Sequence, residues 1–242
     1  MSKKVFIGVG HGGTDPGAIK YVVEKDVNLN MALACKELLE EYGIIVKMSR
    51  EKDENDSLTE EIKEANAFNP DLAVDIHNNA GGGDGFEVYH SINGGTGAIL
   101  AKNIEAEVVK IGQNSRGCKT KKGRNGDYYG FIRRVKAPSV ILEGAFVDNA
   151  KDVKIIDTVA EQKKIGYAYA RGILKTLGIS EKPVKNEPKY DLYKTKPGDT
   201  LWRIAKMFYN NGSQASIMKI AKFNGMENPN ILLPHKTIKI PR

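Results

Sequence analysis

Near its N-terminus the chain reads Val5-Phe-Ile-Gly-Val9-Gly-His11-Gly-Gly-Thr-Asp-Pro-Gly17, a short apolar run that breaks into a glycine-rich loop. A continuous apolar run of this length is typical of a strand buried on both faces of a parallel sheet. Residues 24–42 then place apolar side chains at helical spacing and stop at Gly43, which indicates a helix with a glycine cap. A strand, a loop and a helix in this order form the first unit of an α/β fold.

The alternation of strand-like and helix-like segments continues to about residue 178. Further strands are predicted at 44–48, 72–76, 86–90 and 139–142, and further helices at 58–68, 97–111 and 159–177. Residues 112–137 lose this regularity and are predicted as a long loop with one short strand. The pattern predicts an α/β domain with a mostly parallel, twisted sheet flanked by helices.

Charge and composition divide the chain into a large and a small part. Residues 1–178 hold 25 Lys or Arg and 25 Asp or Glu, whereas residues 179–242 hold 12 and 5, so the net charge of +7 lies in the last part. Residues 179–190 have two prolines and no periodicity, which is typical of a linker. We expect a domain at 1–178, a linker at 179–190 and a small domain at 191–242. Its basic charge favours nucleic acid, a membrane surface or an anionic wall polymer as partner.

Four ionisable side chains stand at the same predicted edge of the sheet. His11, His77 and Glu143 each follow a strand, and Glu24 begins a helix. Functional groups gather beyond the carboxyl ends of parallel strands. Two His and one carboxylate form a recurrent catalytic zinc shell, and a further Glu outside it can act as general base. The pattern predicts Zn²⁺ bound by His11, Glu24 and His77, with Glu143 as the catalytic residue.

Four segments in this order carry a resemblance to a known family. They are residues 9–17, the helix start Glu24-Lys25, Asp75-Ile-His77-Asn-Asn-Ala80 and Leu142-Glu143-Gly-Ala-Phe-Val147. Over roughly residues 4–178 the chain resembles the zinc-dependent N-acetylmuramoyl-L-alanine amidases of the amidase-3 family. The resemblance implies the same zinc ligands and catalytic Glu. It also implies the reaction, in which zinc-activated water cleaves the amide between N-acetylmuramic acid and L-alanine in peptidoglycan.

This chain departs from the family pattern at one place. The family usually has Ser two residues before the second His, where this chain has Asp75. We expect the change to be tolerated and to alter the hydrogen bonding behind His77.

The C-terminal part carries a resemblance of its own. The segments Tyr193-Lys-Thr-Lys-Pro-Gly-Asp-Thr-Leu-Trp-Arg-Ile-Ala205 and Ile238-Lys-Ile-Pro241 are similar to one LysM module, whose fold is βααβ. The resemblance implies binding of N-acetylglucosamine-containing glycans in a groove between two loops. The groove residues are Gly198, Asp199, Thr200, Leu201, Asn228, Pro229, Asn230 and Ile231. Leu201 and Ile231 are also compatible with a role in the hydrophobic core.

The residues alone leave other functions open. A zinc peptidase that cuts within the stem peptide uses the same metal chemistry and differs only in pocket shape. A non-catalytic wall-binding protein has no need of Glu143. Residues 119–136 carry seven Lys or Arg against one Asp, interleaved with Tyr128, Tyr129 and Phe131. This segment could be a nucleic-acid patch, but we favour a solvated loop beside the cleft that contacts substrate carboxylates, and we expect no nucleic-acid partner.

The sequence also gives expectations for location. It has no run of about 18 apolar residues, so membrane insertion is not expected. Residues 5–9 are shorter than the apolar core of a secretory signal. We expect synthesis in the cytoplasm without a signal peptide and action on the cell wall after release, as for a phage endolysin or a sporulation autolysin. Cys35 and Cys118 are expected to be free thiols.

Overall fold

The computed structural model describes residues 2–180, 190–226 and 228–241. They belong to two compact units, Met1–Glu181 and Lys182–Arg242. Most of the predicted linker, residues 181–189, lies outside the described residues. The predicted boundaries at 178 and 190 therefore stay predictions.

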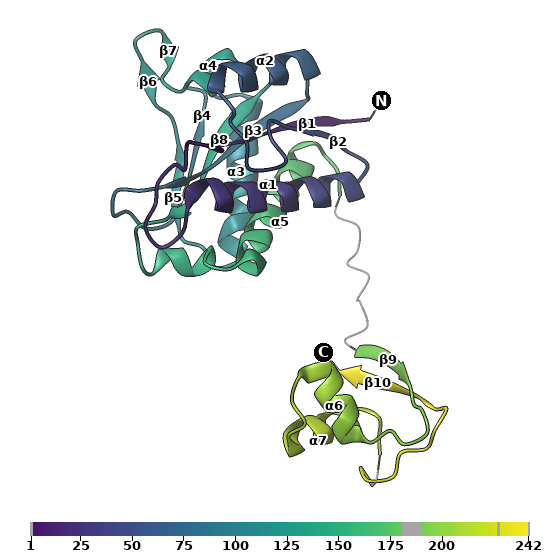
Figure 1. Cartoon of the computed structure of the whole chain (residues 1–242). Helices are drawn as coiled ribbons and strands as arrows, with labels where there is room; N and C mark the ends of the chain where they lie inside the picture. Colours follow the sequence, from purple (N-terminus) through teal and green to yellow (C-terminus); the bar gives the residue numbers. More distant parts are fainter. Residues whose placement is uncertain (1, 181–189, 227, 242) are drawn as a thin grey trace. The chain divides into compact units, whose positions relative to one another are not determined.

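A six-stranded sheet forms the centre of the first unit (Figure 1). Its order is β2-β1-β3-β8-β4-β5. The strands β2, β1, β3 and β8 run parallel, whereas β4 is antiparallel to β8 and parallel to β5. Their bounds are β1 Lys4–Val9, β2 Ile45–Met48, β3 Leu72–Asn79, β4 Phe86–His90, β5 Ser115–Lys119 and β8 Ser139–Phe146. The prediction of an α/β domain with a mostly parallel sheet is confirmed.

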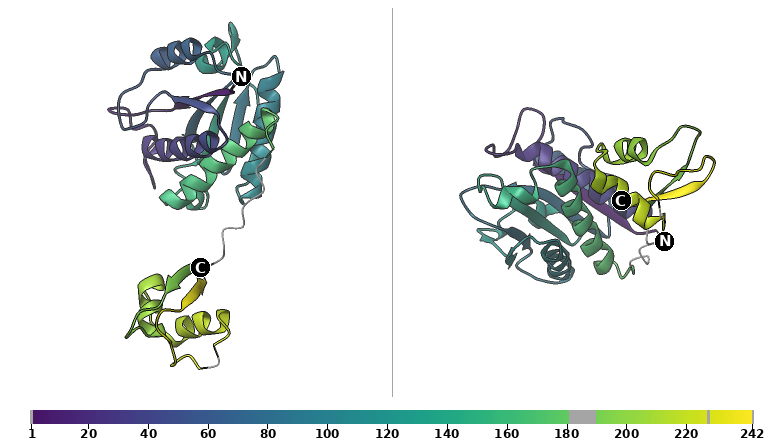
Figure 2. Two further views of the ribbon diagram at one scale, coloured as in Figure 1. Left: turned by 90° about the vertical axis from the view of Figure 1, so that its right-hand side faces the viewer. Right: turned by 90° about the horizontal axis from the view of Figure 1, so that it is seen from below.

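Helices cover both faces of this sheet (Figures 1 and 2). One face carries α1 (Glu24–Glu41), α3 (Thr96–Lys110) and α5 (Val159–Thr176), and the other carries α2 (Leu58–Phe68) and α4 (Gly130–Arg134). Successive strand residues point to opposite faces. Ile7 accordingly lies in the large core with α1, α3 and α5, while its neighbour Phe6 lies in the smaller core with α2 and α4. A short 3-10 helix, η1 (Asp152–Ile155), connects β8 to α5.

The prediction of a long loop at residues 112–137 is wrong. This segment contains β5, a hairpin made of β6 (Lys122–Gly123) and β7 (Gly126–Asp127), and α4. The strands of the hairpin have two residues each, which is too short for a detectable alternation of apolar and polar side chains.

Two strands also run further than predicted. His77 and Glu143 do not follow β3 and β8 but lie within them, paired opposite one another in parallel register. Backbone hydrogen bonds between strands do not depend on side-chain polarity, so pairing continues after the apolar run has ended. A register shift between His77 and Asn79 marks the end of regular pairing.

The second unit has the order β9 (Tyr190–Lys194), α6 (Leu201–Tyr209), α7 (Gln214–Phe223) and β10 (Thr237–Pro241). The two strands pair antiparallel, with Ile238 opposite Tyr193. The predicted βααβ arrangement is confirmed. A small core holds it together, formed by Leu201, Ile204, Ala205, Ile220, Ala221, Ile238 and Ile240. Among the helices described in the two units, none has the length and apolar character of a membrane span.

Candidate metal centre

His11 lies in the turn that follows β1. Its backbone is left-handed, with φ of 62°, which is unusual for a residue with a side chain. The imidazole Nδ1 lies 2.8 Å from Oδ2 of Asp15, and Nε2 lies 3.3 Å from Oε1 of Glu24. One ring nitrogen thus faces a carboxylate of its own loop, and the other faces the start of α1.

Glu24 is the first residue of α1 and is almost fully buried. Its carboxylate accepts hydrogen bonds from the backbone N–H groups of Ala18 at 2.9 Å and Asn78 at 3.1 Å. Burial raises the pKa of Glu24, but the contacts with His11 and His77 outweigh it and hold the pKa well below its usual range. The positive end of the helix dipole acts in the same direction. The carboxylate is therefore ionised and available as a metal ligand.

His77 brings the second imidazole to the same carboxylate. Its Nδ1 lies 3.3 Å from Oε1 of Glu24, and its Nε2 lies 3.4 Å from Oδ2 of Asp75. The rings of His11 and His77 meet edge to face, with centroids 5.1 Å apart. Each imidazole therefore has one nitrogen at Glu24 and the other at a second carboxylate.

The donor set of this cluster fits a zinc ion. Ligand atoms of His11, Glu24 and His77 all lie within 4.8 Å of one another, although the residues come from three distant segments. Imidazole nitrogens and a carboxylate oxygen are ligands that zinc prefers. The carboxylates of Asp15 and Asp75 can each accept the outer N–H of a ring, which leaves the inner nitrogen free to bind metal.

Two glycines leave the room that this cluster needs. A Cβ atom on Gly10 would overlap the imidazole of His77. A Cβ on Gly17, whose φ is 64°, would lie 2.6 Å from Oε2 of Glu24 and 2.7 Å from Cδ2 of His11. The glycine-rich loop after β1 therefore needs glycine both for its backbone conformation and for the close approach of the His11, Glu24 and His77 side chains.

A cleft of about 280 Å³ opens beside the cluster, on the face of the sheet that carries α2 and α4. Glu143 lines it, next to His77 in the register of β3 and β8. Burial raises the pKa of Glu143 to about 7. A carboxyl group with this pKa can both accept and donate a proton near neutral pH. The structure thus brings His11, His77 and Glu143 to one cleft, and Glu24, which does not line it, contacts both imidazoles.

The sequence did not indicate that Glu61 lies next to Asp75, the carboxyl group that contacts His77. Glu61, on α2, and Asp75, on β3, are both buried and line the cleft. Burial and the negative charge of Asp75 raise the pKa of Glu61 well above its usual value. No local pattern could have revealed this contact, because it depends on how α2 packs on the sheet.

Arg50 is another residue whose place beside the site the sequence did not reveal. It is 2% exposed and lies two residues after the end of β2. Its guanidinium donates to the carbonyl oxygens of Val9 at 3.2 Å, Gly10 at 3.3 Å and Lys25 at 2.8 Å. These bonds tie the loop that carries His11 to the first turn of α1, which carries Glu24.

Seven of the eight predicted glycan-binding residues lie in two loops of the second unit, and Leu201 is the first residue of α6. Thr195 joins these loops, because its Oγ1 donates to the carbonyl of Leu233 at 2.7 Å and its own carbonyl accepts from His235 at 2.7 Å. Leu201 is 2% exposed and packs in the core, whereas Ile231 is 63% exposed. The side chain of Leu201 therefore serves folding, and the other seven predicted residues remain at least partly accessible.

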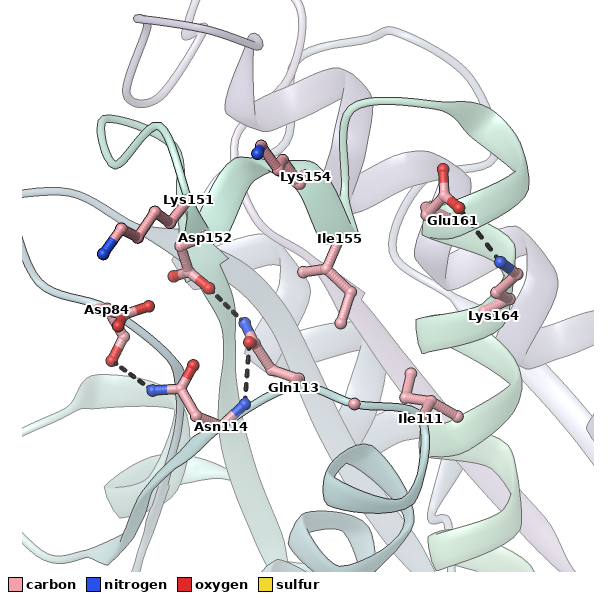
Figure 3. Close-up of a pocket in the computed structure, with 11 residues that line it drawn as sticks. Asp84, Ile111, Gln113, Asn114, Lys151, Asp152, Lys154, Ile155, Glu161 and Lys164 are labelled. Carbon is pink, nitrogen blue, oxygen red and sulfur yellow. Dashed lines mark hydrogen bonds and ion pairs between the residues drawn. The ribbon is translucent and has the colours of Figure 1, made fainter.

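A second hollow, of about 450 Å³, lies near the end of α3 and the start of α5 (Figure 3). Six of its polar residues contact one another: Gln113 donates to Asp152 at 2.6 Å, Asn114 donates to the carbonyl of Asp84 at 3.1 Å, and Lys164 pairs with Glu161 at 3.1 Å. Asp152 also accepts from the backbone N–H groups of Gly85 and Phe146. This network connects the loops after β3 and β8, and we assign the hollow a structural role.

Comparison with known proteins agrees with this arrangement. Residues 5–175 match the model of the N-acetylmuramoyl-L-alanine amidase family Amidase_3, and residues 193–241 match that of the LysM domain. An N-acetylmuramoyl-L-alanine amidase of Bacillus licheniformis, CwlM, is 34% identical over 183 residues, which are 74% of this chain and 70% of that protein. The endolysin of Bacillus phage SPP1 is 29% identical over 231 residues, covering 87% and 83% of the two chains.

Solved structures show the same similarity in three dimensions. Cwp6 from Clostridium difficile superposes with a TM-score of 0.71 at 36% identity, over 73% of this chain and 30% of that one. The similarity thus concerns the first unit and a part of the larger protein.

Proposed function

The chain belongs to the family of N-acetylmuramoyl-L-alanine amidases, and on this basis we propose that it is a zinc-dependent member in which His11, Glu24 and His77 hold the ion and Glu143 moves the proton. Its substrate is peptidoglycan, cleaved at the amide that joins the lactyl group of N-acetylmuramic acid to L-alanine of the stem peptide. One observation carries the zinc proposal: ligand atoms from three distant segments lie within 4.8 Å of one another.

The reaction divides between the ion and the protein. A bound zinc ion would supply Lewis-acid chemistry, which activates water and polarises a carbonyl. Glu143 accepts the proton of the attacking water and then donates it to the alanine nitrogen as the amide bond breaks. Its pKa of about 7 supports both steps, and a nearby cation lowers this pKa and favours the base form needed first. Asp15 and Asp75 orient the two imidazoles.

Digestion of purified cell walls, followed by mass spectrometry of the fragments, tests this proposal. We expect products with a free lactyl group on N-acetylmuramic acid and a free amino group on L-alanine. A chelator should stop the reaction and added zinc should restore it. Cleavage within the stem peptide would instead identify a zinc peptidase, and cleavage that a chelator leaves unchanged would contradict zinc dependence.

We further propose that the second unit binds N-acetylglucosamine-containing glycan. Its two loops would do so through Gly198, Asp199, Thr200, Asn228, Pro229, Asn230 and Ile231. Such binding would keep the first unit at the wall and raise the effective concentration of substrate there. The match of residues 193–241 to the LysM domain and the exposure of these loops support this role.

A chain that ends after residue 181 tests the role of the second unit. It should sediment less with intact cell walls than the full chain does, while it cleaves small soluble muropeptides at the same rate. Equal sedimentation of the two chains would contradict the proposal. The melting temperature of the shortened chain serves as the control for folding.

A further inference from the structure

The cleft beside the metal centre has an unusual distribution of charge. Its described lining contains no Lys or Arg, but it contains five carboxyl groups, those of Asp15, Asp56, Glu61, Asp75 and Glu143. Such a lining offers no cationic side chain to a carboxylate of the substrate. A cationic side chain that binds an acidic part of the substrate must therefore come from outside this lining.

The hairpin of β6 and β7 places cations at this rim. It leads directly into Tyr129, which lines the cleft together with Gly130 and Phe131. The base of the hairpin is fixed, because the buried carboxylate of Asp127 accepts from the hydroxyl of Ser91 at 2.8 Å and from the backbone N–H of Ile92 at 2.7 Å. The hairpin is thus anchored to the segment that follows β4.

Lys121 occupies a defined position on this hairpin. Its Nζ lies 4.0 Å from the ring centroid of Tyr128 and 5.5 Å from that of Tyr129. The two rings meet edge to face at 5.2 Å, and Tyr129 also packs on Tyr89 at 4.9 Å. A cation over aromatic faces keeps its charge and loses side-chain freedom, so it is prepared for an anionic ligand.

Lys121 also differs from its basic neighbours in its partners. Lys119 and Arg116 both contact the carboxylate of Glu87, so their charges are compensated within the protein. In the described residues Lys121 contacts the two tyrosine rings, and no carboxylate lies within ion-pair distance of it. Its positive charge is therefore available to a ligand.

We propose that Lys121, held on Tyr128 and Tyr129, binds a carboxylate of the stem peptide and makes the enzyme prefer acidic stem peptides. This inference rests on the proposed function. In the cleaved bond the lactyl carboxyl group of the sugar is an amide and carries no charge, so the carboxylates near the cleavage point belong to the peptide. A lysine at the cleft then recognises the peptide side of the substrate.

The proposal is tested by measuring how fast the full chain, with zinc, cleaves two soluble muropeptides. One muropeptide has free carboxylates on its stem peptide, and the other is the analogue in which these groups are carboxamides. We expect Lys121→Gln to lower kcat/KM for the muropeptide with free carboxylates roughly 5- to 20-fold, because a hydrogen bond between charged groups is lost. The kcat/KM for the carboxamide analogue should change by less than about 2-fold. Lys122→Gln removes the same charge one residue away, without a contact to either tyrosine among the described residues. It should change neither substrate by more than about 2-fold.

Further controls distinguish an effect of the charge at residue 121 from a loss of folding. Lys121→Arg should restore most of the preference, and the melting temperatures of all variants should match. An equal loss on both substrates, no loss on either, or the same loss in Lys122→Gln would overturn the proposal. So would an effect of Lys121→Gln on sedimentation with intact walls alone, which would assign the lysine to an anionic wall polymer. If the unaltered chain cleaves neither muropeptide, the proposed function itself fails.

Discussion

Replacement of Gly10 by Ala tests the geometry of the metal centre through a single methyl group. A Cβ at this position would approach three atoms of the His77 ring to less than 3.0 Å. Gly10 is not among the residues with positive φ, so its backbone accepts Ala without strain. The whole cost therefore falls on the position of the imidazole.

The size of the effect follows from the tolerance of metal sites. Non-bonded carbon atoms need about 3.5 Å, so the ring must move by at least about 0.5 Å. Metal–ligand distances tolerate only about 0.2 Å. Changing a residue that merely orients a ligand costs about 10- to 100-fold in affinity, so displacing the ligand itself should cost at least about 100-fold, or about 2.7 kcal/mol.

Zinc affinity, measured by titration against a chromogenic chelator, provides the assay. The zinc-free variant should still fold, which its melting temperature shows. Gly97→Ala is the matched control, because its Cβ would lie 3.3 Å from the carbonyl oxygen of Ser139, which a shift of a few tenths of an ångström relieves, and the residue lies in α3, where Ala is favourable. An unchanged zinc affinity in a folded Gly10→Ala variant would refute the placement of His77.

Three further predictions concern other carboxyl groups. Glu143→Gln should lower kcat about 100- to 10,000-fold and retain zinc affinity, since the residue moves a proton and does not hold the ion; muropeptide kinetics and zinc titration check this. Asp75→Asn should weaken zinc binding about 10- to 100-fold, and an unchanged affinity would show that the contact with His77 is unimportant. Burial raises the pKa of Glu87, but the hydrogen bonds from Lys119 and Arg116 outweigh burial and lower the pKa below its ordinary value of 4.5. The ionised carboxylate therefore stabilises the folded chain at pH values above 4.5, and this stabilisation is lost as the pH falls through the lowered pKa. Urea unfolding of Glu87→Gln should show a deficit of about 1.5–3 kcal/mol at neutral pH that closes in acid.

The sequence was sufficient for the parts of the fold that have long periodic patterns. The strand at β1 and the helix at α1 were predicted nearly to the residue, because a buried apolar run and a helical stripe are local signals. The ends of β3 and β8 were missed, since pairing between two neighbouring strands carries His77 and Glu143 inside the sheet. The β6–β7 hairpin was missed because two-residue strands leave no pattern.

The candidate site could likewise be predicted only in part. The candidate ligand residues could be named because each stands at the end of a recognisable segment or within a quoted motif. Their support could not be foreseen: Glu61 reaches Asp75 only because α2 packs over the sheet, and Arg50 is buried only because three carbonyl groups converge on it. Such contacts are long-range, so they are determined by tertiary packing and are invisible in local sequence.

The most direct test of the metal centre is a crystal structure of the protein grown with zinc, with anomalous diffraction data collected on both sides of the zinc absorption edge. We expect one strong anomalous peak within about 2.0–2.2 Å of Nε2 of His11, Nδ1 of His77 and a carboxylate oxygen of Glu24. A peak bound by other residues, or none in crystals whose zinc content is confirmed, would contradict the account.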